Sequence, residues 1–240
     1  MFETADVAMA VGFTVFWIAS IAYRPAWKFF LTHLVTFVHE LGHAFTGFLV
    51  GRGVGGIKLH FDGSGETRDF GFRGWLPFGL SRTISLLMGY PAPVLLGAFL
   101  LGAGVGNYIN LAMWIMLFFG LFCLIFVRNL WGLLVVLGWI GFSLLAATYL
   151  YDNVLAEIVV VAVGTFFVVG GIKDLFMLFN QLTTGQAADT DLGIMQRERW
   201  GFPKTLTYLG MVLLALPGGW FMFLLSSTLL ERIPMLTALS

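Results

Sequence analysis

Long apolar runs alternate with short polar stretches along most of this chain. A helix that crosses a membrane needs about 20 mostly apolar residues. The pattern therefore predicts an all-α polytopic membrane protein with about seven transmembrane helices, at about 7–23, 29–50, 81–103, 107–126, 129–150, 154–179 and 205–230. Pro91 and Pro93 lie inside the third of these runs and are expected to kink it.

Two longer polar stretches, 51–75 and 180–204, separate these runs. The first is rich in glycine, and residues 57–61 alternate between apolar and polar side chains, as a strand does. Asp62-Gly63-Ser64-Gly65 is a typical turn sequence, and residues 66–72 can return as a second strand. The pattern predicts a small β-hairpin after the second helix, with a flexible polar loop as the alternative.

Composition supports the membrane assignment and limits the classes of function. Of the 240 residues, 59% are hydrophobic and 11% are charged, against roughly 25% charged in soluble domains. A soluble domain of this length could not bury so much apolar surface, whereas a lipid bilayer acts as a solvent for it. We expect a single integral membrane domain, 1–240. The zero net charge gives no support for a nucleic-acid partner.

The basic residues predict the orientation, because cytoplasmic loops carry an excess of Lys and Arg. With the N-terminus in the cytoplasm, ten of the 13 Lys and Arg residues fall on the cytoplasmic side, and the other three are Arg24, Lys28 and Arg232. We expect a cytoplasmic N-terminus, an external C-terminus, and both polar stretches on the cytoplasmic side. This charge bias suits a bacterial inner (cell) membrane.

The sequence His39-Glu40-Leu41-Gly42-His43 lies inside the second apolar run, 29–50, and has the form HExxH. Residues four apart share one face of a helix, so both histidines can bind one ion. Imidazole nitrogen suits Zn²⁺, and two histidines with one carboxylate leave a position open for water. Glu40 lies beside that face and can act as the general base of a peptidase.

The position of this motif adds weight to a functional interpretation. Three ionisable residues inside an apolar helix are energetically costly unless they have partners or a function. Two alternatives are hydrogen bonding to neighbouring helices and a redox-metal or haem site, but neither explains Glu40 between the histidines. Gly42 is a poor helix former that would allow another backbone to approach the metal face closely.

A zinc site of this kind needs a third protein ligand. His60, Asp174, Asp189 and Asp191 are all expected on or near the cytoplasmic side. His33 lies about two turns toward the other side and is a poor ligand. Spacing alone leaves these alternatives open.

Three asparagines lie near the ends of predicted helices, at Asn107, Asn110 and Asn129. Their amide groups can cap helices or form hydrogen bonds between helices, which is the interpretation we favour. Orientation of a substrate backbone is the alternative.

Several segments resemble one family. The HExxH helix, the glycine-rich 51–53, and the segment 58–67 are similar to the site-2 protease class of intramembrane zinc metallopeptidases, in its short bacterial-type branch without a PDZ domain. Segments 89–93 and 128–132 are also similar to that branch. The resemblance implies zinc binding by His39 and His43, with Glu40 as the base. It also implies a hairpin that presents substrate as an added strand, and an active site toward the cytoplasm.

The third ligand departs from the common pattern of this class. Many site-2 proteases take it from an Asp-Gly in a late transmembrane helix, but the Asp-Gly here, Asp62-Gly63, lies in the predicted hairpin. The short branch resembles this chain in a different respect: its third ligand is an Asp among small residues after the sixth span. The segment that matches this description best is Ala188-Asp189-Thr190-Asp191. By resemblance the third ligand is therefore expected to be Asp189, ahead of Asp191 and Asp174.

The sequence thus predicts an intramembrane zinc metalloprotease that hydrolyses peptide bonds of membrane-spanning proteins or peptides within the lipid bilayer. One alternative is a non-catalytic zinc-binding subunit with partners in a membrane complex. Another is a metal-ion transporter. Two features argue against a transporter: the ionisable residues cluster in one motif, and no symmetric repeat is visible in the sequence.

Overall fold

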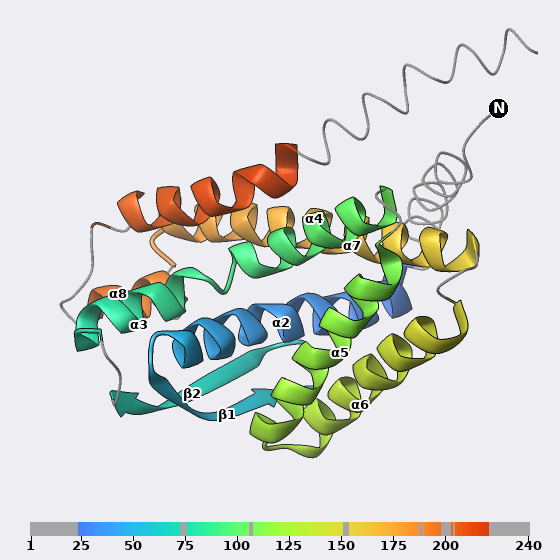
Figure 1. Ribbon diagram of the computed structural model, residues 1–240. Helices are drawn as coiled ribbons and strands as arrows, with labels where there is room; N and C mark the ends of the chain where they lie inside the picture. The colour runs from blue at the N-terminus through green and yellow to red at the C-terminus, as the bar shows by residue number, and fades with distance from the viewer. Residues whose placement is uncertain are drawn as a thin grey trace, which may run out of the picture.

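The computed structural model describes residues 24–72, 76–105, 108–150, 154–186, 188, 190–197, 203 and 205–220. These residues form a mostly helical protein with one small antiparallel sheet (Figure 1). The labelled elements are α2 (Arg24–Leu49), β1 (Arg52–Leu59), β2 (Gly65–Phe72), α3 (Phe78–Leu87), α4 (Pro91–Val105), α5 (Ile109–Phe126), α6 (Leu130–Leu145), a π-helical turn (Ala146–Leu150), α7 (Val154–Thr183) and α8 (Asp191–Arg197). A further helix spans Thr205–Trp220.

Within the described residues, three helical segments are long and apolar enough to cross a membrane: Ile109–Phe126, Leu130–Tyr149 and Ile158–Thr183. They agree with the fourth, fifth and sixth predicted spans, so the chain is an integral membrane protein. The predicted second span, 29–50, forms helix α2, which is not among these three segments. The predicted first span, 7–23, lies outside the described residues, and the last is described only as Thr205–Trp220. The total of seven therefore stays a prediction.

The third predicted span, 81–103, is divided into two helices. α3 ends at Leu87 and α4 begins at Pro91, with a 54° bend between them. Proline lacks the amide hydrogen that a continuous helix needs and clashes with the preceding turn. The expected kink is confirmed as a break, and counting the two helices as one span gives up to four candidate spans among the described residues.

The predicted β-hairpin is confirmed. β1 and β2 are antiparallel, with Lys58 opposite Glu66 and Leu59 opposite Gly65. At the turn, Gly63 has a φ of +88°, a conformation that glycine adopts readily. Ser64 donates hydrogen bonds to the Asp62 carboxylate from its backbone N–H (2.9 Å) and from its hydroxyl (2.7 Å). These local bonds fix the turn that the sequence indicated.

α2 is the central helix, lying against both strands on one side and near α4 and α7 on the other (Figure 1). Its Phe37 is fully buried and meets the Trp139 ring of α6 edge-to-face at 5.1 Å. The Trp139 indole N–H donates a 2.7 Å hydrogen bond to the Met116 carbonyl of α5. The core thus holds the helix that bears the HExxH motif in a fixed position between the hairpin and the bundle.

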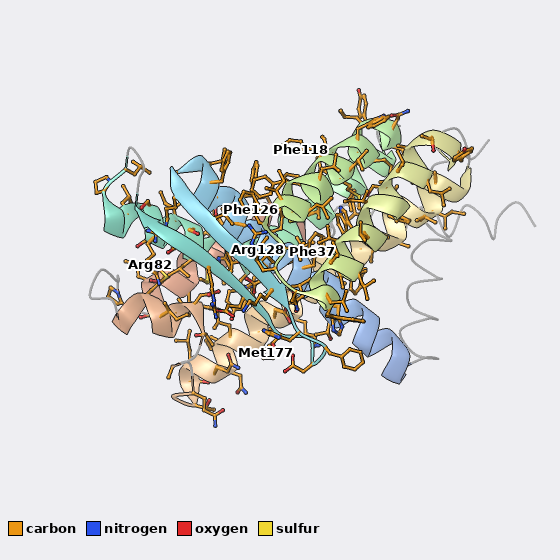
Figure 2. All side chains as sticks on the ribbon, turned by 90° about the horizontal axis from the view of Figure 1, so that it is seen from below. Phe37, Arg82, Phe118, Phe126, Arg128 and Met177 are labelled. Atoms are coloured by element: carbon orange, nitrogen blue, oxygen red, sulfur yellow. The ribbon has the colours of Figure 1, made fainter. Side chains whose placement is uncertain are left out.

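Large apolar side chains also cover the outer faces of α5 and α6. Phe118 points away from the bundle, whereas Phe37 points into it (Figure 2). The exposed apolar residues of α5 recur along one face of the helix and comprise Leu111, Trp114, Phe118, Leu121 and Ile125. A continuous apolar outer face is typical of helices in contact with lipid.

α4 and α7 approach each other closely at a pair of glycines. A methyl group built on Gly97 would lie 2.5 Å from the Gly164 carbonyl oxygen, and one on Gly164 would lie 2.9 Å from the Gly97 oxygen. Small residues allow membrane helices to come into backbone contact, where dispersion forces associate them.

Gly97→Ala should therefore destabilise the protein, because the added methyl group meets backbone that cannot rotate away. We expect the free energy of unfolding in detergent to fall by about 1–3 kcal/mol. Gly138→Ala is the matched control, since a methyl group there meets no atom of the described residues within 4 Å. Equal stability of the two variants would contradict the close α4–α7 contact.

Candidate metal centre

α2 supplies the two histidines of the motif on one face. The helix continues through His39 and His43, so the i, i+4 spacing brings their Nε2 atoms to 3.0 Å from each other. The rings are nearly perpendicular, with centroids 4.7 Å apart. Glu40 lies next to this pair and is buried. The local geometry that the sequence predicted is therefore present.

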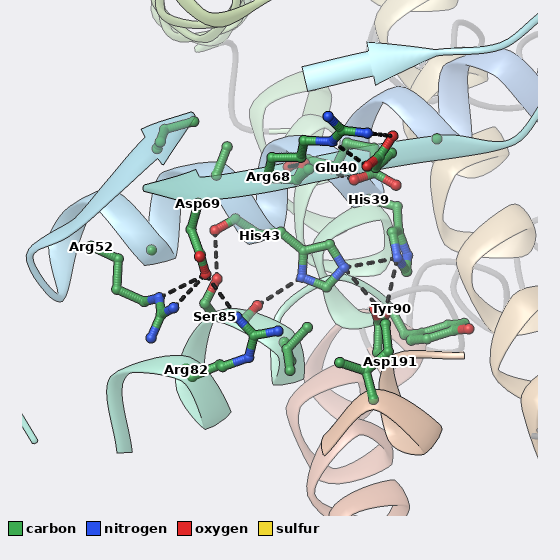
Figure 3. Close-up of a pocket in the computed structure, with 18 of the residues that line it drawn as sticks. His39, Glu40, His43, Arg52, Arg68, Asp69, Arg82, Ser85, Tyr90 and Asp191 are labelled. Carbon is green, nitrogen blue, oxygen red and sulfur yellow. Dashed lines mark hydrogen bonds and ion pairs between the residues drawn. The ribbon is translucent and has the colours of Figure 1, made fainter. Parts of the chain in front are cut away.

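The carboxylate of Asp191 completes a three-residue cluster (Figure 3). Its Oδ2 atom lies 3.2 Å from the Nε2 atoms of both His39 and His43. Asp191 is the first residue of α8, so the fold brings it to the motif from far along the sequence. Burial alone would raise the pKa of Asp191, but the positive charge of the two histidines, when they are protonated, outweighs burial and holds that pKa below its usual range.

The other ligand candidates are placed differently. His60 is exposed at the hairpin turn, where its carbonyl accepts a 3.1 Å hydrogen bond from His33 Nε2, and neither joins the cluster. Asp174 is half-buried on α7 and is also outside it. Asp189, the expected third ligand, lies outside the described residues. Among the described residues, Asp191 is the carboxylate that meets both histidines.

The donor atoms of this cluster suit a cation. His43 Nδ1 lies 2.8 Å from the Ser85 carbonyl oxygen, which can only accept, so Nδ1 carries a hydrogen and, in the neutral imidazole, Nε2 presents a lone pair. Among the described residues, Asp191 Oδ2 is buried with no polar partner other than the two histidines. Zinc bonds of about 2.0–2.1 Å in a tetrahedron separate ligand atoms by roughly 3.3 Å, close to the 3.0–3.2 Å found here.

The break between α3 and α4 lies directly against the two histidines. A methyl group on Gly89 would overlap His43 and lie 2.8 Å from Cε1 of His39. The neighbouring Tyr90 ring meets the His39 ring edge-on at 4.7 Å. A methyl group on Gly42 would lie 2.7 Å from the Met88 carbonyl oxygen, so the close backbone approach expected at Gly42 is confirmed.

The second strand of the hairpin contacts Glu40. Gly65, Thr67 and Asp69 alternate with Glu66 and Arg68 along β2, and the first three face α2 or the cleft, as the two-residue period of a strand requires. The Thr67 hydroxyl donates a 2.7 Å hydrogen bond to Glu40 Oε2. Glu66 and Arg68 pair with each other and also border the cleft. Sequence reasoning placed the hairpin but missed the contact between Thr67 and Glu40.

These residues line a cleft of about 570 Å³. The metal cluster and Glu40 form one part of its wall, and β2 forms another. Beyond His43, Asp69 accepts hydrogen bonds from Arg52 Nε (3.0 Å) and from Arg82 Nη1 (3.1 Å) (Figure 3). Arg52 also donates to the Ser81 hydroxyl at 3.4 Å. This network joins the start of β1, the end of β2 and α3 at one end of the cleft.

Together, the fold and this cluster define a membrane protein with a candidate mononuclear metal site beside a buried carboxylate. The sequence profile of the family described as Peptidase M50B-like matches residues 7–225, and the chain belongs to that family. The resemblance to the site-2 protease class is thereby confirmed. No curated protein and no solved structure gives a match.

The cluster predicts which carboxylate holds the metal. Loss of a residue that hydrogen-bonds a metal ligand typically lowers metal affinity by roughly 10–100-fold. Asp191→Ala should weaken zinc affinity more than this, because it removes one of the three candidate ligands themselves. Zinc content of the purified protein, measured by atomic emission, checks this. Asp174→Ala is the matched control and should retain zinc. Loss of zinc in Asp189→Ala but not in Asp191→Ala would contradict the assignment.

Proposed function

We propose that this protein is an intramembrane zinc metalloendopeptidase in which His39, His43 and Asp191 hold the ion and Glu40 is the general base. The observation that carries the proposal is the convergence of two imidazole nitrogens and one carboxylate oxygen, 3.0–3.2 Å apart, beside the Glu40 carboxylate. Membership of a peptidase family supports the reaction class. The three ligands leave a tetrahedral ion one open position, as catalytic zinc sites require.

The geometry of the site suggests a chemical role for each of its groups. When bound, the zinc ion supplies Lewis acidity that polarises the scissile carbonyl and makes water a stronger acid. Glu40 takes a proton from the attacking water and delivers it to the leaving amine. The Ser85 carbonyl fixes the tautomer of His43, so that its Nε2 lone pair faces the site. Burial of Glu40 keeps bulk water from competing for that proton.

The two edges of the hairpin differ in their availability to a substrate. β1 is covered on its outer edge by residues 127–129. There, the Arg128 N–H donates to the Ile57 carbonyl at 2.9 Å, and the Asn129 side chain exchanges hydrogen bonds with the backbone N–H and carbonyl of Leu59. Within the described residues, β2 has β1 as its one strand partner and borders the cleft. A substrate strand therefore adds to β2.

A membrane-spanning substrate must unwind before cleavage, because helical hydrogen bonds occupy its carbonyl groups. Pairing with β2 gives the unwound segment new hydrogen-bond partners beside Glu40. The proposed substrates are thus membrane-embedded proteins or peptides that present an extended segment to the hairpin within the bilayer.

We propose that the protein lies in a bacterial inner membrane with a cytoplasmic N-terminus and an external C-terminus, the orientation that the distribution of Lys and Arg predicts. This orientation is supported by the cleft, because Arg52, Arg82 and Asp191, which are all expected on the cytoplasmic side, line it together with the hairpin.

Glu40→Gln should lower turnover of a model single-span substrate by about 10²–10⁴-fold, since the amide cannot accept the proton. The variant should retain zinc, because Glu40 is not among the three ligands. His43→Ala should lose both zinc and cleavage. Purified wild type and variants are compared in liposomes for cleavage rate and zinc content.

The same experiment separates the alternatives. Zinc binding without cleavage of any substrate in a broad panel would favour a non-catalytic subunit. Zinc flux into liposomes would favour a transporter. If His43→Ala left the metal content unchanged, the metal assignment would be wrong.

Disulfide trapping tests which strand receives the substrate. Cys123→Ala removes the one cysteine of the sequence, and Glu40→Gln preserves the substrate. Glu66→Cys and Lys58→Cys then place single cysteines at paired positions on β2 and β1. A strand added to β2 lies about 4.8 Å from it and roughly 10 Å from β1, beyond the reach of a disulfide. A substrate cysteine should therefore crosslink at position 66. Preferential crosslinking at 58 would refute addition to β2.

A further inference from the structure

We propose that Thr67 of β2 is a positioning residue that orients the general base Glu40 and so links the substrate-binding strand to proton transfer. This inference rests on the proposed function. It assigns to the hairpin a second role besides pairing with substrate.

The first observation is the hydrogen bond between the two side chains. Thr67 Oγ1 lies 2.7 Å from Glu40 Oε2 and 3.2 Å from the Glu40 backbone carbonyl oxygen. A hydroxyl donates one hydrogen, and the shorter contact to a charged acceptor is the stronger. Thr67 therefore donates to the carboxylate and fixes one of its two oxygens.

The second observation is the restricted space around the carboxylate. A methyl group on Gly65 would lie 2.6 Å from Glu40 Oε1, 2.7 Å from its Cγ and 2.8 Å from the Thr36 methyl group. The β2 backbone thus lies directly against Glu40, which is 5% exposed. Gly65 limits the rotamers of Glu40 at Oε1 and Cγ, while Thr67 holds Oε2.

The third observation is the register that brings both residues to Glu40. Gly65 and Thr67 are two residues apart and therefore share one face of β2. The hairpin turn is attached to α2 separately, since Thr36 donates a 2.7 Å hydrogen bond to the Gly63 carbonyl and His33 bonds the His60 carbonyl. Docking of the hairpin and positioning of the base thus use different hydrogen bonds, so they can be tested separately.

Thr67→Val keeps the branched shape and the strand preference but removes the hydroxyl. We expect kcat to fall about 10- to 100-fold, the loss typical of a misplaced reacting group, with KM and zinc content unchanged. Thr67→Ser should restore most of kcat because it restores the donor. Thr36→Val is the matched control: it removes a 2.7 Å hydrogen bond between α2 and the hairpin that does not involve Glu40.

A readout independent of turnover accompanies the rates. Binding of an uncleaved substrate segment to chelator-treated protein should be the same for wild type and Thr67→Val, because the β2 backbone is intact. In the Glu40→Gln background, Thr67→Val should cause no further loss of residual cleavage.

Three outcomes would overturn the inference: equal kcat losses in Thr67→Val and Thr36→Val, failure of Thr67→Ser to recover, or a change confined to KM and substrate binding. If wild type cleaves, Glu40→Gln does not, and Thr67→Val cleaves at the wild-type rate, the inference fails and the proposed function stands. If wild type cleaves nothing in the panel, both fail together.

Discussion

The structure depends on one electrostatic constraint, the convergence of three electron-rich atoms inside a membrane protein. The Nε2 atoms of His39 and His43 and Oδ2 of Asp191 lie 3.0–3.2 Å apart in a largely buried position. When both imidazoles are neutral, lone pairs directed at one another repel, and burial strengthens that repulsion because the surroundings screen it poorly. A divalent cation between them turns this repulsion into coordination, which is why the cluster is best explained as a metal site.

The surrounding elements serve this centre by filling space and by satisfying the remaining polar groups. The break after α3 places the Gly89 backbone against the imidazole rings, where a side chain would not fit. Ser85 hydrogen-bonds both the ring and the backbone of His43. From the opposite side, Thr67 bonds Glu40. Each of the three polar residues of the motif thus has a partner from a different element: Asp191 of α8 for His39, Thr67 of β2 for Glu40 and Ser85 of α3 for His43.

Features encoded over short distances could be predicted from the sequence. The apolar runs identified the helices of the bundle, because burial in lipid depends on local hydrophobicity. The turn at Asp62-Gly63 identified the hairpin, because side-chain bonds and a positive φ are local properties. The i, i+4 spacing of His39 and His43 predicted a shared metal face for the same reason.

Contacts between distant segments could not be predicted this way. Spacing left four candidate third ligands open, namely His60, Asp174, Asp189 and Asp191, and the packing of α8 beside the motif brings Asp191 to the histidines. The contact of Thr67 with Glu40 likewise depends on how β2 lies on α2. The sequence by itself therefore determined the membrane class, the hairpin and the shared helical face of the two histidines. The tertiary structure alone decided which distant side chains lie at the candidate site, because loop paths and helix packing leave no local pattern.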